Sequence, residues 1–383
     1  MEIKNINQGL VLKTIEEHAP ISRADIGKLI GLTPPTVSAI VKNLIERNIV
    51  QEIGKGDSSG GKKPILLQLN SETAFMIAID LGGENGIRAA LIDLAYNIIR
   101  EKCSPKIESF NSQKLKKVLT TLLTEFITEL AEEGIPKEKI LRICIGVPGI
   151  IDFKEMKVTV APFLNWEISL QDLNLNELGI PVIFENDVNL MALGENIKGI
   201  AQEFDNFVFV GERTGIGAGI VINGKLYQGA NNAAGEIGYL FIDPRYAPEN
   251  PRDYGCLEKL ASYEVITKKA REKMGKDIRI TEIFKMASQG NTIAKEIVQE
   301  ALRYLAYGIA NISSVLNPEL VIIGGGISIL PPSFLKDIRI TLQKIIPFVP
   351  RIEFSRLGED GVLIGAAVKV FVPLKKKGLS LIK

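Results

Sequence analysis

A glycine-rich stretch at residues 208–239 has the composition of a turn that approaches a phosphate group. A short apolar run meets the turn, a second apolar run follows, and Asn223-Gly224 then predicts a tight hairpin turn. Gly215, Gly217 and Gly219 alternate, so one face of the second expected strand carries no side chains. Two interpretations follow. Either another backbone packs closely on this face, or bare N–H groups cradle a phosphate where glycine permits the approach.

Asp187 stands where an acid could act on a bound ligand. A short apolar strand at 181–184 runs into residues 185–195, which begin a helix. Ligands bind at such strand ends in open α/β sheets. Asn186 and Asp187 are good helix-capping residues. Asp187 is alternatively a general base that takes the proton of a substrate hydroxyl.

The elements that must position these residues predict an α/β architecture with a faint internal repeat. A strand at 75–80 ends in a glycine turn and is followed by a strand at 87–94, which repeats the pattern of residues 208–239. The other expected elements are a strand near 98–102, a helix at 111–133, a buried strand at 141–146 before the Pro-Gly turn of 146–152, a helical region at 255–289, a helix at 292–316, a strand at 320–323 before the glycines of 324–328, and a last helix at 361–371.

The first seventy residues have an organisation of their own. Helices are expected at 6–18, at 24–30 after a capping Ser22, and at 33–50, where Thr33 is the cap and Pro34 the first helical position. Strands near 50–53 and 65–69 flank a basic hairpin, which completes a winged helix-turn-helix pattern. The alternative is a small helical interaction module on a Gly/Ser linker. The side chains expected to meet bases and phosphates are Thr33, Thr36, Ser38, Lys42, Asn43, Lys55, Lys62 and Lys63.

Composition excludes several classes of protein. The chain has 383 residues, 46% of them hydrophobic and 24% charged, which is typical of a soluble protein of two or three domains. A net charge of +1 gives no global attraction to nucleic acid or membrane. No run reaches transmembrane length, and the first residues lack a signal-peptide pattern. Three scattered cysteines predict free thiols and a cytoplasmic location.

The ordered set of motifs resembles the ROK family of repressors, open reading frames and sugar kinases. The set runs DLGG, GVPG, NW, ENDVN, TGIGAGIV, AAGEIGY, GCLE, GGGIS and LGEDGVLIGAA after a winged helix. The resemblance implies an N-terminal winged helix-turn-helix followed by the two-lobed actin-like ATPase/hexokinase fold. It also points to the winged-helix regulators of the xylose-repressor and N-acetylglucosamine-repressor type. The implied domains are the winged helix at 1–70, a first lobe at 71–189 with 361–383, and a second lobe at 190–360.

The same resemblance implies roles for individual residues. Asp187 matches the catalytic base, and Asp80 matches the acid that works with magnesium at the first phosphate motif. The residues that resemble sugar contacts are Gly149, Asn165, Asn186, Asp187, Glu236, Tyr239 and Glu258. Those that resemble ATP contacts are Asp80, Gly82, Thr214, Gly215 and Gly217 at the phosphates and Gly324, Gly325 and Gly326 at the adenosine.

The chain departs from the family pattern at four places. Tyr239 stands where a histidine usually serves both sugar and zinc, and Cys256 is the one cysteine left of a usual zinc-binding run. Zinc requires four ligands, so we predict that the family's zinc site is absent. Glu84-Asn85 replaces the usual Thr-Lys after DLGG, and Arg213 stands where the kinases carry glycine.

Two functions from different classes follow. The first is a sugar-responsive transcriptional repressor of carbohydrate metabolism, with operator DNA and a sugar effector as partners and a homo-oligomer, dimer or higher, as the acting form. The second is an ATP-dependent sugar kinase of the glucose or N-acetylglucosamine type, with Asp187 as general base and ATP and Mg²⁺ as cofactors. A third is a lobe pair that only oligomerises. The winged helix favours the repressor, because a plain kinase has no use for a DNA-binding module.

Overall fold

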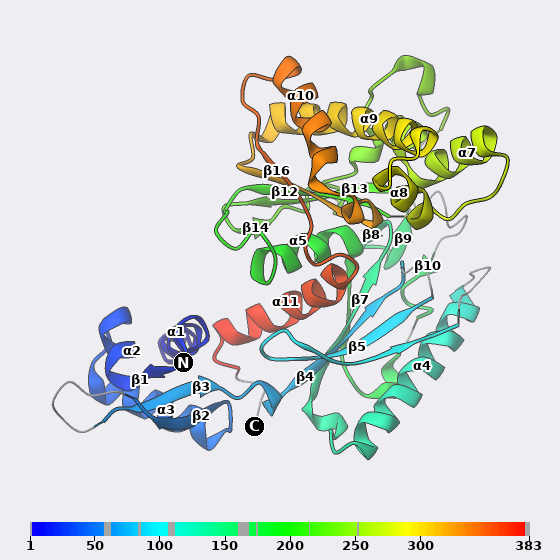
Figure 1. Ribbon diagram of the computed structural model, residues 1–383. Coiled ribbons are helices and arrows are strands. Elements are labelled where there is room, and N and C mark those ends of the chain that lie inside the picture. Colours follow the sequence, from blue (N-terminus) through cyan, green and yellow to red (C-terminus); the bar gives the residue numbers. More distant parts are fainter. Residues whose placement is uncertain are drawn as a thin grey trace.

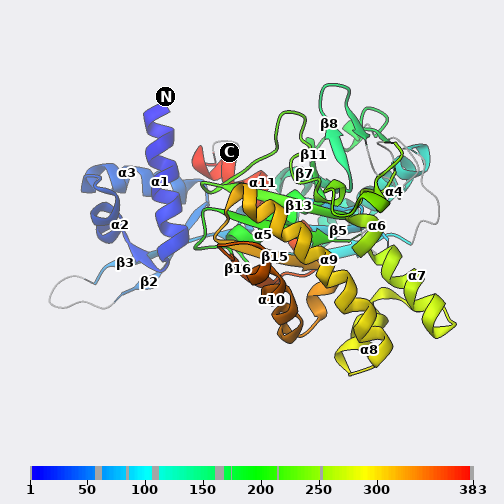
Figure 2. The same cartoon turned by 90° about the horizontal axis from the view of Figure 1, so that it is seen from above.

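The chain folds into a small N-terminal domain and two larger lobes (Figure 1). The computed structural model describes residues 2–56, 63–82, 86–105, 112–159, 168–173, 175–213, 215–250 and 253–379. Seen from above, the N-terminal domain lies at one side of the lobes, with the end of the last helix beside it (Figure 2). No helix in the described ranges is long and apolar enough to cross a membrane.

The N-terminal domain is the expected winged helix. Ser22 accepts a hydrogen bond from the N–H of Asp25 and so caps the second helix, which ends at Gly31 in the left-handed conformation. The third helix ends at Glu46, four residues before the expected position, and Asn48 turns the chain with a φ of 55°. The elements are α1 (Glu2–His18), β1 (Ile21–Ser22), α2 (Arg23–Ile30), α3 (Pro34–Glu46), β2 (Val50–Lys55) and β3 (Ile65–Leu69).

The first lobe is built on a five-stranded sheet whose central strand is entirely buried. The strand order is β11-β7-β4-β5-β6, and the hydrophobic residues of its two faces fall into separate clusters. The strands are β4 (Phe75–Asp80), β5 (Arg88–Asp93), β6 (Ile98–Cys103), β7 (Ile140–Val147) and β11 (Val182–Asn186). Helix α4 (Ser112–Glu132) covers one face and α11 (Asp360–Lys376) the other. A small sheet of β8 (Ile150–Asp152), β9 (Lys157–Thr159) and β10 (Ile168–Ser169) lies beside it.

The second lobe repeats this plan. Its sheet has the order β14-β13-β12-β15-β16, with β12 paired antiparallel to β13 and parallel to β15. The strands are β12 (Phe207–Glu212), β13 (Ile216–Ile222), β14 (Lys225–Leu226), β15 (Leu320–Gly325) and β16 (Arg351–Phe354). The helices are α6 (Glu258–Ala261), α7 (Tyr263–Met274), α8 (Ile280–Ser288), α9 (Thr292–Leu316) and α10 (Leu335–Ile345). The last strand and α10 have no counterpart among the expected elements.

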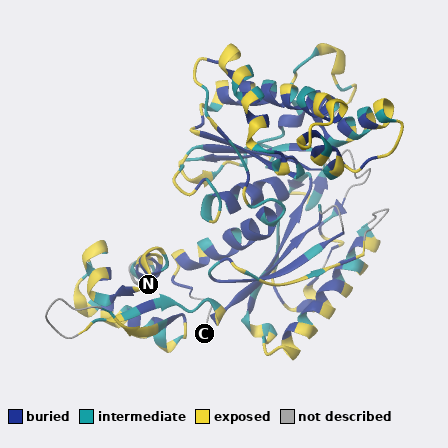
Figure 3. Ribbon diagram, viewed as in Figure 1, coloured by how far each residue is buried: buried dark blue, intermediate teal, exposed yellow. Residues whose placement is uncertain are grey.

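Two helices lie between the sheets and join the lobes. Helix α5 (Asp187–Ile197) packs along α11, and both are almost wholly buried (Figure 3). A side chain at Gly365 would overlap the carbonyl oxygen of Leu190, so glycine is required for this close approach. The alternating glycines of β13 also permit a close approach to α5, because Gly217 faces Val188 and Gly219 faces Ala192. Close packing, the first of the two interpretations, therefore accounts for Gly217 and Gly219.

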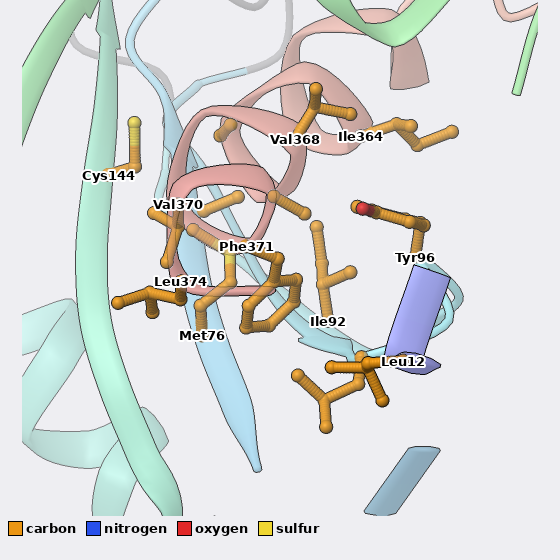
Figure 4. Close-up of a cluster of buried hydrophobic side chains, with 14 of the residues drawn as sticks. Leu12, Met76, Ile92, Tyr96, Cys144, Ile364, Val368, Val370, Phe371 and Leu374 are labelled. Atoms are coloured by element: carbon orange, nitrogen blue, oxygen red, sulfur yellow. The ribbon is translucent and has the colours of Figure 1, made fainter. Parts of the chain in front are cut away.

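One hydrophobic core runs from the winged helix into the lobes. Leu12 of α1 belongs to the same buried cluster as Met76 and Ile92 of the first sheet and Phe371 and Leu374 of α11 (Figure 4). The expected last helix ended at residue 371, whereas α11 continues to Lys376 and so reaches the N-terminal domain. The winged helix is therefore packed against the lobes and not joined only by a linker.

Candidate functional site

A buried arginine lies at the point where the two lobes meet. Arg213 follows the last residue of β12, and its Nη1 donates hydrogen bonds to Oδ1 of Asp80 at 3.1 Å and Oδ2 of Asp187 at 3.0 Å. Its Nη2 donates to Oδ2 of Asp80 at 2.8 Å and to Oε2 of Glu359 at 2.9 Å. Asp80 ends β4, Asp187 begins α5 and Glu359 immediately precedes α11. One guanidinium from the second lobe thus joins three carboxylates.

The first expected phosphate motif is covered by this guanidinium. A side-chain carbon added at Gly82 would lie 3.1 Å from Nη1 of Arg213 and 3.2 Å from Oδ2 of Asp187. The N–H of Gly82 donates to Oδ1 of Asp80 at 2.9 Å. Asp80, Gly82 and Asp187 therefore come together as expected, with Arg213 between them.

The charges of this group are set by burial and by one another. Burial raises the pKa of the Asp187 carboxyl to about 6, against the opposing effect of Arg213. Burial acts to lower the pKa of Arg213, but the three carboxylates outweigh it and hold that pKa well above its usual range. Arg213 therefore stays charged, and Asp187 is ionised at neutral pH.

Glu236 and Glu258, the other two expected acids, have different surroundings. Glu258 is buried, and its two oxygens accept the N–H groups of Ile216 at 3.1 Å and Gly255 at 3.0 Å. These bonds fix the glycine hairpin to the turn before α6. Glu236 is half-buried, and burial raises the pKa of its carboxyl to about 7, assisted by the negative charges of Glu258 and Asp187. The negative charge of Asp187 therefore opposes the ionisation of Glu236.

Asn186 ties the start of α5 to the turn after β7. Its side chain accepts the N–H of Asn189 at 2.9 Å, the expected cap, and its Nδ2 donates to the carbonyl oxygen of Gly149 at 3.1 Å. Gly149 has a φ of 107°, a conformation that favours glycine. The expected sugar contacts Gly149, Asn186 and Asp187 are therefore neighbours in the structure.

Glu185, which precedes Asn186, is buried and bonded to side chains from several elements. Its Oε2 accepts Nζ of Lys369 at 2.7 Å and Nε2 of Gln228 at 3.0 Å, and its Oε1 accepts Nδ2 of Asn189 at 3.1 Å. Gln228 belongs to the second lobe and Lys369 to α11. Glu185 therefore connects α5, α11 and the loop that leads to Glu236.

The remaining glycine turns are tightly packed. The position of a side chain at Gly215 faces Oε1 of Glu258 at 2.6 Å. Gly324 lies against Phe209, and Gly325 has a φ of 89° with no room for a side chain beside the backbone of Glu212. Oη of Tyr263 accepts the N–H of Ile327 at 3.0 Å. The turn at 324–326 is thus held against α7.

The residues at the usual zinc position do not match zinc coordination. The Cys256 thiol accepts the N–H groups of Ile242 and Asp243, each at 3.3 Å, and donates to the carbonyl oxygen of Asp243 at 3.3 Å. Burial and nearby carboxylates raise the pKa of Tyr239 to about 12, so its hydroxyl is neutral. In the described part of the chain, no three His, Cys, Asp or Glu side chains form a metal-binding group. The absence of zinc stays a prediction.

The expected DNA-binding side chains lie on the exposed parts of α3 and the wing, with one exception. Thr33, Ser38, Lys42, Lys55 and Lys63 are exposed, and Thr36 is partly so. The Thr33 hydroxyl does not cap α3 and instead lies 2.8 Å from that of Thr36. Asn43 accepts a hydrogen bond from Gln8 of α1 at 3.1 Å, which gives it a structural role. Lys62, Thr214 and Asn165 fall outside the described residues.

Two functional positions, Arg213 and Glu185, had a signal in the sequence that was not sufficient to place them. Arg213 was visible as a cation in place of glycine, but its three acidic partners lie far away in sequence. Glu185 stands next to Asn186, yet nothing local indicates that it reaches Lys369. Such contacts depend on how α5 and α11 pack, which a single sequence does not encode locally.

Two family models match this chain. The ROK family model covers residues 76–370, and a winged helix-turn-helix DNA-binding model covers residues 4–51. The chain belongs to the ROK family. The xylose repressor of Bacillus subtilis is 34% identical over 96% of this chain and 92% of its own length. The transcriptional dual regulator NagC of Escherichia coli is 26% identical over 85% and 82%.

Solved structures of ROK proteins are also similar to this chain. A ROK family transcriptional regulator, a homologue of the E. coli MLC protein, matches all of this chain and 99% of its own with a TM-score of 0.82 and 27% identity. A ROK glucokinase of Streptomyces griseus, solved with glucose and AMPPNP, matches 77% of this chain and 98% of its own with a TM-score of 0.67 and 25% identity. The match to the regulator includes the winged helix.

Proposed function

We propose that this ROK protein is a transcriptional repressor that binds operator DNA through its winged helix and releases it when a sugar binds between the lobes. The observation that carries the proposal is the position of α11. It begins beside Arg213 between the lobes, packs along α5, and ends against α1 of the winged helix. A DNA-binding domain and a ligand cleft thus share one buried helix.

The winged helix presents a DNA-binding surface. The exposed hydroxyls of Thr33 and Ser38 lie at the start of α3, where recognition helices meet base edges. Lys42 and the wing residues Lys55 and Lys63 are exposed and suited to phosphates. Because this surface is small, we expect two copies on two half-sites, which makes a homo-oligomer the acting form. A DNA-bound regulator of this kind is expected in the cytoplasm.

The polar groups between the lobes have the chemistry of a sugar site. Asn186, Asp187 and Glu236 supply amide and carboxylate groups, the polar groups that bind sugar hydroxyls. The relatives named xylose repressors make xylose the first sugar to test and N-acetylglucosamine, suggested by the N-acetylglucosamine repressors among the relatives, the second.

The end of α11 has specific contacts with the winged helix. Lys375 is buried, forms an ion pair with Glu16 of α1, and donates to the carbonyl oxygen of Leu94 at 2.7 Å. A side chain at Gly9 of α1 would overlap the carbonyl oxygen of Lys376. Arg47, which follows α3, donates to the carbonyl oxygens of Gly378 and Leu379. A shift of α11 would therefore move α1 and the end of α3.

The middle of α11 is linked to the proposed sugar site through α5. Lys369 binds Glu185, which stands one residue before Asn186. A sugar that reorients Asn186 and Asp187 would change the position of α5, and the close contact at Gly365 passes that change to α11. This gives one ligand different affinities for two states, which is the requirement for allostery.

The kinase alternative has no comparable support. Asp187, its proposed base, is ion-paired with Arg213, and Arg213 lies over the glycine of the first phosphate motif. A phosphate approaching Gly82 would have to displace this cation.

A gel-shift titration with DNA from upstream of the chain's own gene tests the repressor, in the presence and absence of xylose and N-acetylglucosamine. We expect a specific complex that one sugar dissociates. No specific complex at low salt, or a complex that none of the sugars in a wider panel affects, would refute the proposal. Arg303→Ala, at an exposed position of the second lobe, is the control for unspecific effects of a substitution.

A further inference from the structure

The cluster around Arg213 has an excess of negative charge. Asp80 is completely buried, Asp187 and Arg213 are nearly so, and Glu359 is half-exposed. Three carboxylates therefore face a single guanidinium. In the described part of the chain, no other side chain combines this burial with three acidic partners.

The geometry of the guanidinium fits these carboxylates closely. Arg213 binds Asp80 through both of its outer nitrogens, which is the bidentate arrangement that arginine favours. Nη1 is shared between Asp80 and Asp187, and Nη2 between Asp80 and Glu359. The guanidinium sits where the acids of β4, α5 and the residue before α11 converge, as a divalent cation would, and carboxylate oxygens are the ligands that such cations prefer.

We propose that Arg213 is a built-in counter-ion that closes this cleft to divalent cations and nucleotide phosphates, so that the sugar binds alone. Asp80 and Gly82 are the residues that the family resemblance assigns to magnesium and phosphate, and Arg213 satisfies the first and covers the second. The residues present therefore do not fit a magnesium nucleotide. The inference deepens the proposed function, on which it rests for the identity of the ligand as a sugar.

The sugar-facing groups are still available in this arrangement. Among the described residues, Oδ1 of Asp187 accepts the N–H of Val188 alone, at 3.0 Å, and can receive a sugar hydroxyl as well. Arg213 fixes the orientation of this carboxylate through its other oxygen. Arg213 is thus a positioning residue for sugar binding and the residue that determines which ligands enter.

The decisive variant is Arg213→Met, which keeps most of the side-chain length but removes the charge. It leaves three carboxylates without a cation, so we expect millimolar Mg²⁺ to bind there and raise the Tm of the variant by several degrees. The wild-type Tm should not respond to Mg²⁺. The matched control is Arg88→Met, because Arg88 also pairs with two carboxylates, Glu101 and Asp360, the second of which follows Glu359 in the chain. It should lose stability without gaining a response to Mg²⁺.

Calorimetric titration of the wild-type protein with MgATP tests the same inference without a variant. We expect no binding of MgATP, with or without sugar, and a sugar Kd that changes less than about twofold when MgATP is present. An MgATP complex of wild type, or Arg213→Met that folds but ignores Mg²⁺, would overturn the inference. If Arg213→Met does not fold, the wild-type titration decides alone.

The two proposals fail in different ways. A protein that binds MgATP but still releases DNA on sugar binding would refute the role of Arg213 and leave the repressor standing. A protein that ignores MgATP and gains the Mg²⁺ response in Arg213→Met, but binds no specific DNA, would support Arg213 and refute the repressor.

Discussion

A buried cation lies at each end of α11, and the two cations have different partners. At the cleft end, Arg213 faces three carboxylates and has four hydrogen bonds to them. At the DNA-domain end, Lys375 has one carboxylate, Glu16, one carbonyl oxygen, and the ring of Tyr96 with its centroid 4.0 Å away. Both cations join separate parts of the molecule, but with unequal electrostatic support.

The pKa shifts of the two cations differ in direction. The carboxylates hold the pKa of Arg213 well above its usual range, whereas burial lowers the pKa of Lys375 despite Glu16. Charge is therefore favourable at the cleft end and costly at the DNA-domain end. There the contact depends mainly on the shared hydrophobic core of Leu12, Phe371 and Leu374 (Figure 4). Such a contact can change position without losing a strong ionic bond, which suits a junction that must respond to sugar.

The largest effect should come from removing either cation and comparing the losses. Arg213→Met leaves buried carboxylates without a partner and should lower the free energy of unfolding by about 3–5 kcal/mol. Lys375→Met removes a charge that burial disfavours and keeps the apolar contacts, so its loss should not exceed about 1 kcal/mol. Urea unfolding measures both. Equal losses would show that the two clusters are held alike.

The packing of α5 on α11 should have the next largest effect. Gly365→Ala forces a side-chain carbon into the carbonyl group of Leu190 and should cost about 1–3 kcal/mol. Gly361→Ala is the matched control on the same helix, because its added carbon would meet Met191 at an ordinary 3.5 Å. Its stability should stay within about 0.5 kcal/mol of wild type. If the two variants unfold alike, the close contact at Gly365 does not join the helices.

A smaller effect concerns pH at the sugar site. The folded protein raises the pKa of Glu236 from 4.5 to about 7, so it binds a proton that the unfolded chain releases between these values. This group therefore stabilises the fold less as pH rises from about 4.5 to about 7. Glu236→Gln removes the titration, so its Tm should fall less than that of wild type across this interval. Glu203→Gln, at an exposed position, should behave as wild type. A parallel pH dependence of Glu236→Gln and wild type would contradict the assignment.

Local signals were sufficient for the winged helix and for most strands and helices of the lobes. Ser22 and Gly31 mark the ends of α2, and the glycine turn at Asn223-Gly224 is formed by two residues with positive φ. These features depend on neighbours in sequence. The predicted end of α3 was wrong by four residues, because the apolar Ile49 and Val50 also suit the turn and strand that form there.

The site was predictable as a set of residues but not as a network. Asp80, Gly82, Asn186 and Asp187 do meet, as the motifs indicated. Their contact with Arg213 and the contact of Glu185 with Lys369 join residues between 26 and 184 positions apart. These pairings depend on how the lobes pack, and so does the turn of Asn43 away from the DNA-binding surface and toward Gln8.

The central claim is that α11 carries the sugar signal to the winged helix, and Lys369 is the residue that tests it. The measurement is operator affinity, by fluorescence anisotropy, with and without saturating sugar for wild type, Lys369→Met and the exposed control Lys376→Met. Sugar should weaken DNA binding by about 5- to 150-fold in wild type and in the control. In Lys369→Met we expect this factor to fall well below the wild-type value while the sugar Kd changes little. An unchanged factor in Lys369→Met would contradict the claim.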